Sequence, residues 1–500
     1  MAKALKSSSE LTRRGRTAFS YKGIESTTNR RNPITRTTPE VVHLTGAKRQ
    51  TASGTIRDDR RNFTILAWMI RKHLDNVSRF TPFVRTGDDK VDAIAKKCLR
   101  WHGMRRNFDA IGRHGRDEFM RMFESCKVIS GDAGALKVKG GKLQGIEGDR
   151  LAIPGGATGE YTAADKTVFG EEGLAFTGDG SRKAWCLCKR SGVRGEQLVY
   201  ERTIPAEDLF FDGYWPERFD ANRGVSPIIT ALNDATDVRE SWEWIVLKIK
   251  QSGLFGIGFT RQGADPISPI QNAESDDESE PETKEESYTQ QLSRAIQARG
   301  LINLDLDPGD DFKEFESKTP YPAAVEFTRE LVRAILLALD IPFTFYDSLT
   351  ASFSARVADR NEYEEACEWK RDKNIGVLDE IYGGWLFPLW AQIDLFGIGK
   401  ALAAASIDVE NLAASVHWMP AGKPWLDRTN EMSGHILALA AGVTSVPRIC
   451  AMYGDDAYAI AKEQKEFLEK SGIPLLYAQG GQVSVQEIMK GQMNGNDKAK

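Results

Sequence analysis

The sequence predicts a mostly helical α+β protein, and three observations lead to this prediction. Apolar residues recur every three or four positions over long segments in both halves of the chain, which is the period of an amphipathic helix. Residues 133–212 are instead rich in glycine and hold short apolar runs between turn residues, which is typical of strands. Two of the long helical segments flank residues 252–320, which contain only short strand-like pieces and a run of acids.

The length and composition are those of a folded protein with more than one domain. The chain has 500 residues, of which 41% are hydrophobic and 28% are charged. No run approaches the roughly 18 uncharged apolar residues that a membrane helix needs, so we expect no membrane partner. The N-terminal residues lack the apolar segment of a secretory signal, and we expect the protein to stay in the cytoplasm where it is made.

Charge is unevenly distributed along the chain, whose net charge is −4. Residues 1–61 carry fourteen Lys and Arg against five Asp and Glu, whereas residues 274–286 carry eight acids and one lysine. We expect residues 1–55 to form a basic N-terminal arm, which is either mobile or ordered only against a partner. The acidic run should be a solvated loop, because its few apolar groups cannot offset the entropy lost on ordering it.

A helical region is expected over residues 56–130, ahead of the β-rich segment. Residues 88–102 and 115–129 both show the helical period. An earlier segment places one apolar face along a helix, formed by Phe63, Leu66, Met69, Ile70 and Leu74.

Two long helices are expected in the middle of the chain. The first should cover residues 225–251, because Pro227 follows Ser226, a good N-cap, and apolar residues then recur at helical steps. Its regular part of about 22 residues would be roughly 33 Å long. The second should cover residues 321–342.

A polar, serine-rich connection at residues 343–355 leads from the second long helix to a third helical pattern, which ends near residue 397. Gly383, Gly384 and Pro388 interrupt this pattern, so we expect a kink there.

Short helices are expected near the C-terminus, over residues 427–470. Gly442, Gly454 and Gly472 are natural stops for them. The tail, residues 473–500, should be weakly structured.

Sequence motifs of enzymes are missing from the chain. It contains no GxxxxGK[ST], GxGxxG, HExxH or GxSxG segment. Cys186 and Cys188 would share one side of a strand, and Cys98 and His102 one side of a helix, but no further ligands at zinc spacing accompany either pair. We therefore expect reduced thiols and ordinary packing, with no catalytic residue, no cofactor and no metal.

Five segments carry a resemblance to a known family. In chain order they are DRRNFTILAWMIRKHLDNV, LQGIEGDRL, IPAEDLFFDGYWPERFDANRGVSPIITALNDATD, SLTASFSARVADRNEYEEACEW and WMPAGKPWLDRTNEMSGHILALAAGVTS. Each is similar to a motif of the lambda-like portal protein family of tailed double-stranded DNA bacteriophages, and they stand in the order that the family has. The chain departs from the family at Asp427-Arg428, where Asp-Pro is usual.

The resemblance implies a subunit with wing, stem, clip and crown regions, which assembles into a ring of twelve around a DNA channel. Residues implied for each region are 56–224 for the wing, 225–251 and 321–342 for the two stem helices, 252–320 for the clip with its acidic loop, 343–355 for a tunnel loop, 356–424 for a kinked helix and the rest of the wing, and 425–472 for the crown.

The resemblance also implies site residues. Residues implied near the channel constriction are Leu349, Thr350, Ser352, Ser354 and Arg356, of which the last would lie close to passing phosphates. Residues implied for the stem are Trp242, Ile245, Lys248, Arg329 and Arg333. A surface loop far from any channel is the alternative for residues 343–355.

The implied partners are double-stranded DNA, the large terminase subunit, a head–tail adaptor and a capsid or scaffold protein, at the portal vertex of a virion. The net charge of −4 suits a channel that passes DNA without holding it, because many phosphate contacts would make binding strong. An alternative function is a nucleic-acid-binding protein that uses its basic N-terminal arm; assembly size distinguishes the two.

Overall fold

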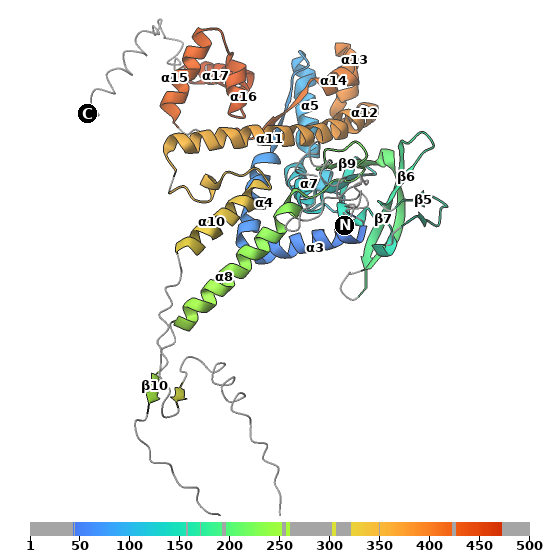
Figure 1. Cartoon of the computed structure of the whole chain (residues 1–500). Helices are drawn as coiled ribbons and strands as arrows, with labels where there is room; N and C mark the ends of the chain where they lie inside the picture. The colour runs from blue at the N-terminus through green and yellow to red at the C-terminus, as the bar shows by residue number, and fades with distance from the viewer. Residues whose placement is uncertain are drawn as a thin grey trace, which may run out of the picture.

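The computed structural model describes residues 44, 46–156, 159–170, 172–192, 197–252, 257–260, 303–306, 322–349, 351–422 and 427–472. These residues form helices and strands, with helices in the majority, as expected. A body of helices carries a strand-rich module at one side, and two helices, α8 and α10, extend away from the body (Figure 1). The expected arm before residue 44, the acidic run and the tail lie outside the described residues.

The helical region ahead of the strands divides into five helices: α3 (Gly46–Asn62), α4 (Thr64–Val77), α5 (Asp89–His102), α6 (Arg105–Phe108) and α7 (Arg116–Ser130). Phe63 is extended and separates the first two. The predicted apolar face is confirmed, since Phe63, Leu66, Met69, Ile70 and Leu74 are all buried.

The boundary of the N-terminal arm was predicted wrongly. Helix α3 begins at Gly46, so residues 46–55 belong to the folded body rather than to an arm. The reason is tertiary: Arg49 is buried and donates to the Ser130 carbonyl 3.3 Å away, and Ser53 is buried too. A polar sequence gives no apolar period from which such a helix could be predicted.

The β-rich prediction for residues 133–212 is confirmed. Strand β2 (Asp132–Val138) lies at the centre of an antiparallel sheet between β3 (Lys142–Glu147) and β9 (Leu209–Gly213). A second antiparallel sheet has the order β6-β7-β8, and a short hairpin precedes it. Their bounds are β4 (Tyr161–Thr162), β5 (Val168–Phe169), β6 (Leu174–Phe176), β7 (Arg182–Ser191) and β8 (Gln197–Pro205).

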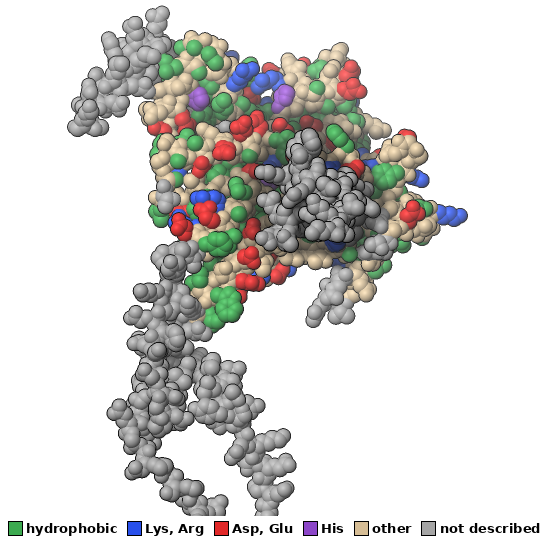
Figure 2. Space-filling model, viewed as in Figure 1, with side chains coloured by type: hydrophobic (Ala, Val, Ile, Leu, Met, Phe, Trp, Pro, Cys, Tyr) green, Lys and Arg blue, Asp and Glu red, His purple; other side chains and the backbone are tan. Residues whose placement is uncertain are grey.

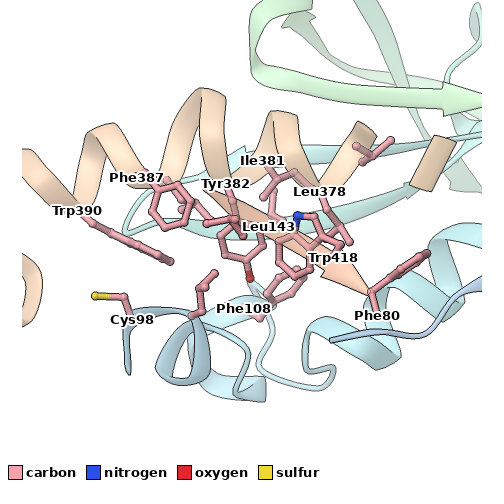
Figure 3. Close-up of a cluster of buried hydrophobic side chains, with 14 of the residues drawn as sticks. Phe80, Cys98, Phe108, Leu143, Leu378, Ile381, Tyr382, Phe387, Trp390 and Trp418 are labelled. Atoms are coloured by element: carbon pink, nitrogen blue, oxygen red, sulfur yellow. The ribbon is translucent and has the colours of Figure 1, made fainter. Parts of the chain in front are cut away.

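A strand pair joins distant parts of the chain. Strand β1 (Phe80–Val84) pairs antiparallel with β12 (Val416–Pro420), so that Pro82 lies opposite Trp418. Beside this pair lies a core in which aromatic rings from elements far apart in the sequence meet (Figure 3). The rings of Tyr382 and Trp418 are 5.0 Å apart at their centroids.

The predicted interruption of the third long helix is confirmed. Helix α11 (Phe353–Ile381) passes into a π-helical turn, η6 (Tyr382–Leu386), before α12 (Phe387–Gln392) begins. The two glycines lie inside the turn, and Pro388 lies in the first turn of α12, where proline is best tolerated in a helix. Two short helices follow, α13 (Ile398–Ala405) and α14 (Val409–Ala414).

The short C-terminal helices are also confirmed, as α15 (Arg428–Ala440), α16 (Val446–Met452) and α17 (Ala457–Ser471). Gly442, Gly454 and Gly472 have positive φ just after these helices, as expected of stops. The helices lie on the far side of α11 from α8 (Figure 1), and no residue in them is buried.

Candidate functional site

The first long helix begins with the predicted cap. The Ser226 hydroxyl accepts a hydrogen bond from the Ile228 N–H, and Pro227 occupies the first turn. This turn, η4 (Pro227–Ala231), is a 3-10 helix, and α8 (Leu232–Ser252) follows it. The predicted α-helix from residue 225 was therefore too long at its start.

A buried ion pair fixes the start of this helix to the sheet. Arg223 and Asp132 are 2% and 0% exposed, and two guanidinium nitrogens donate to the two carboxylate oxygens at 2.7 and 2.9 Å. The remaining donors reach the carbonyls of Leu151, Glu172 and Gly148. All these acceptors lie in the strand-rich module or at its edge, so Arg223 joins that module to the root of α8.

The backbone at Gly224, next to this ion pair, is closely packed and hydrogen-bonded. The Gly224 N–H donates to Asp132 at 3.0 Å, and the Gly224 carbonyl accepts from Arg49. A Cβ on Gly224 would collide with the Gly131 carbonyl, so a larger residue does not fit. The RGVS segment is therefore a structural joint. Its arginine and glycine were part of the resemblance, but Asp132 and Arg49 carry no sequence signal that predicts their role.

A polar cluster lies inside the body next to this joint. Glu124 and Lys127 of α7 are 2.9 Å apart, and Lys127 also reaches Asp212 at 2.7 Å. His73 of α4 lies 3.1 Å from Glu124. Burial opposes the charge on Glu124, but Lys127 and a hydrogen bond from His73 outweigh it and lower the pKa of Glu124. Burial also lowers the pKa of His73, so this ring is a neutral structural partner.

The second long helix, α10 (Pro322–Leu337), packs against α8. It ends five residues before the predicted boundary because Asp340 takes a left-handed conformation, with φ 60°. The Ile341 N–H then donates to the Leu336 carbonyl at 3.1 Å, which is the hydrogen bond of a Schellman cap. Lys370 of α11 stabilises this turn by donating to the Asp340 carboxylate at 2.6 Å.

The first part of the connection after α10 is fixed to the body. The ring of Phe345 packs on Tyr363 at 5.3 Å, and that of Tyr346 packs on Trp68 at 6.2 Å. The Thr344 hydroxyl donates to Asp359 at 2.7 Å. Residues 343–347 are therefore held in place by aromatic and polar contacts from both sides.

Two of the predicted stem residues take part in that attachment. Arg329 pairs with Asp347, and the guanidinium groups of Arg329 and Arg333 lie 5.7 and 5.1 Å from the Phe343 ring. Both arginines thus connect α10 to the start of the connection.

The other predicted stem residues lie on α8. Trp242 is half-buried and packs edge-on against Phe63, with ring centroids 6.0 Å apart. Ile245 is half-buried, and the side chain of Lys248 lies outside the described residues.

The second part of the connection is exposed at Ser348 and Leu349. Leu349 is 94% exposed, and Thr350 lies outside the described residues. Ser352 is the N-cap of α11 and accepts from the Ala355 N–H. Because α11 begins at Phe353, Ser354 and Arg356 lie in its first turn and not in a loop; the predicted loop, 343–355, was too long at its C-terminal end. The serine-rich sequence correctly indicated a connection, but it also contains Ser352, the N-cap at which α11 starts.

Apolar side chains remain uncovered on the outer parts of α8 and α10. Trp244 and Phe327 are 69% and 63% exposed, and Val246 and Leu247 are also exposed. Figure 2 shows apolar surface on this part of the molecule, towards the end of α8. An exposed apolar patch on extended helices is typical of a surface that binds another protein.

The two side-chain pairs considered above as possible metal ligands, Cys98 with His102 and Cys186 with Cys188, are all buried. The Nε2–H of His102 donates to the Gly141 carbonyl at 2.7 Å, its Nδ1 lies 3.0 Å from the Tyr382 hydroxyl, and Cys98 is buried one turn earlier on the same helix. Cys186 and Cys188 are buried in one cluster. Among the described residues, no group of three His, Cys, Asp or Glu side chains could hold a metal. None of the described helices is long and apolar enough to span a bilayer.

Comparison with known proteins identifies the family. The model of the lambda family of phage portal proteins matches residues 28–370, which is more than half of the chain. The chain therefore belongs to the lambda family of phage portal proteins. No curated protein sequence matches the chain.

Solved structures of gene transfer agent particles are similar to this chain at 14% identity, each with 80% of this chain covered. They are the virion of the native particle (92% of that chain, TM-score 0.35), the neck of the empty particle computed with C6 symmetry (92%, 0.37) and the neck of the native particle computed with C12 symmetry (93%, 0.35).

Proposed function

We propose that this chain is the subunit of a ring that forms the portal of a virion, through which double-stranded DNA is packaged and ejected. The observation that carries the proposal is the family match over residues 28–370. A ring of twelve is the assembly that the family resemblance implies.

The surface of α8 and α10 supports assembly into a ring. Their outer apolar side chains, among them Trp244 and Phe327, have no cover in one subunit. Burial of apolar surface is favourable at about 25 cal/mol per Å². Adjacent copies of the same two helices would cover each other in a closed ring, in which each subunit offers two different faces to its neighbours.

The regions of the proposed portal follow the elements. Helices α8 and α10 would form the stem, and α15, α16 and α17 the crown. The clip would lie between the stem helices, where β10 (Ile257–Thr260) and β11 (Asn303–Leu306) pair in parallel. The clip would dock the terminase large subunit during packaging and the head–tail adaptor afterwards, and the wing would contact a capsid or scaffold protein.

Residues 348–351 are the proposed tunnel loop, in which Ser348 and Leu349 are exposed. Its neighbours on both sides are fixed, by Arg329 to Asp347 and by the cap at Ser352, so the tip between them is presented on rigid supports. Leu349 would then lie near the constriction and Arg356 near its edge.

Shortening the tip tests this function. Deletion of residues 348–351 keeps Asp347 and Ser352 and should leave ring assembly intact, because the packing lies in the flanking helices. We expect capsids with the shortened portal to package or retain less DNA than those with the natural portal, measured as the yield of DNA-filled capsids.

Shortening an exposed turn elsewhere is the matched control. Residues 178–180, in the turn between β6 and β7, are exposed, and their deletion should leave DNA packaging unchanged. Normal packaging and retention by the 348–351 deletion, in capsids whose portal is assembled, would refute the tunnel loop.

A further inference from the structure

The three C-terminal helices, α15, α16 and α17, have no core of their own. None of their side chains is buried in the single subunit. The exposed large apolar side chains of α15 and α17 are Met432, Ile436, Tyr458, Phe467 and Leu468. Apolar surface concentrated in this way is typical of a region that another chain covers.

Helix α17 is attached to the body near its start. Arg85, which follows β1, pairs with Asp456 at 3.0 Å, and its guanidinium group lies 4.2 Å from the centre of the Tyr458 ring. From Ala461 to Ser471, every residue is exposed except Gln464, which is half-buried. A helix of 15 residues is only marginally stable in water by itself, so packing against a partner would stabilise the end of α17.

Two rows of charged residues flank the apolar stripe of α17. The stripe contains Ile460, Phe467 and Leu468, because residues seven or eight positions apart lie on one face of a helix. Each row has spacings of three and then four positions, so its members are neighbours along one side of the stripe. The first row is Lys462, Lys465 and Glu469. The second row is Glu463, Glu466 and Lys470.

The two rows are complementary in charge at each step. Every residue of the first row is followed in the sequence by a residue of opposite charge in the second row, as Lys462 is by Glu463. Adjacent residues of a helix do not face each other, so these charges do not pair within one helix. Among the described residues, the pair formed inside α17 by members of the two rows is Glu466 with Lys470, at 3.9 Å, and both belong to the second row.

This pattern fits a second copy of the same helix. In two parallel copies at the same height, the first row of one would oppose the second row of the other with a lysine facing a glutamate at every step. Leu468 lies beside the first row and Phe467 beside the second, so the same contact brings Leu468 of one copy to Phe467 of the next.

We propose that α17 binds α17 of the neighbouring copy through these two rows, which gives the ring a second contact between subunits besides that of α8 and α10. The proposal rests on the proposed ring. The contact uses a different face of α17 on each side, as a closed ring of more than two copies requires.

Charge reversal at one step of the rows tests the contact in the full-length protein. Lys462→Glu and Glu463→Lys should each weaken association of the subunits about two- to fivefold per contact, measured by analytical ultracentrifugation over a range of concentrations. The double variant, which exchanges the two charges, should associate as the natural protein does. Phe467→Ser should weaken association about tenfold and leave the melting temperature of the dissociated subunit unchanged, because this side chain is 52% exposed there.

The rescue distinguishes a second copy from any other partner, because only a contact between copies changes both of its sides in one variant. Lys189→Glu, at an exposed lysine of β7, is the control and should associate normally. Unchanged association in both single variants, or a double variant no better than either, would overturn the contact while rings seen by electron microscopy leave the proposed portal standing. Absence of rings in the natural protein would overturn both.

Discussion

Replacement of Arg223 by Met tests the joint between the strand-rich module and α8. The substitution keeps much of the side-chain volume but leaves the Asp132 carboxylate, which is 0% exposed, with the Gly224 N–H at 3.0 Å and Arg49 at 3.8 Å. Three carbonyls, those of Leu151, Glu172 and Gly148, also lose the hydrogen bond from Arg223. Breaking a buried ion pair on one side costs about 3–5 kcal/mol in the free energy of unfolding.

The assay is thermal unfolding followed by circular dichroism, together with hydrogen exchange. At about 2–4 °C per kcal/mol for a cooperative unit of this size, the melting temperature should fall by roughly 6–20 °C. Amides at the root of α8 should exchange faster. Arg202→Met, at an exposed arginine of β8, is the control and should change stability by no more than about 0.5 kcal/mol.

A double substitution sharpens the test. Because Asp132→Leu removes the charge that Arg223→Met leaves unpaired, the two changes together should cost less than the sum of the single changes. A loss below about 1 kcal/mol in Arg223→Met would refute the reasoning, because it would mean that the pair does not hold the joint.

Three further predictions concern the core, the stem and the connection. Burial lowers the pKa of His102 from 6.5 to about 4. The contribution of the neutral ring to the free energy of unfolding is therefore fully present above pH 6.5, and up to about 3 kcal/mol of it is lost as the pH falls towards 4. Urea unfolding of His102→Gln should show a weaker pH dependence of stability over that range. Trp242→Asp should lower the free energy of unfolding in urea by about 2–4 kcal/mol, because Trp242 packs against Phe63. Trp244→Asp, at an exposed site, should leave the subunit folded and weaken subunit association, measured by analytical ultracentrifugation. Phe343→Ala should lower the melting temperature, since two arginines pack on this ring, and Leu349→Ala should not; equal effects would contradict the division of the connection into a fixed and an exposed part.

Local signals in the sequence were enough to predict several elements. The apolar period of α4, the Ser226-Pro227 start of the first long helix and the interruption at Gly383-Gly384 each depend on neighbouring residues, and the structure has all three. Capping and helix breaking act over a few positions, so they are visible in one sequence.

Features that depend on distant residues could not be predicted. The pairing of β1 with β12 joins Phe80 to Pro420, and nothing near either strand specifies the partner. The start of α3 depends on contacts of Arg49 with residues far along the chain. The Arg223–Asp132 pair could not be predicted either, because nothing in the sequence indicates that these two charged residues are buried together.

Electron microscopy of the purified full-length protein, with its mass measured by light scattering, tests the central claim most directly. The account predicts rings of twelve subunits, each of 55.6 kDa, with an open channel along the axis. Particles with the mass of one or two subunits, or closed assemblies without a channel, would contradict it.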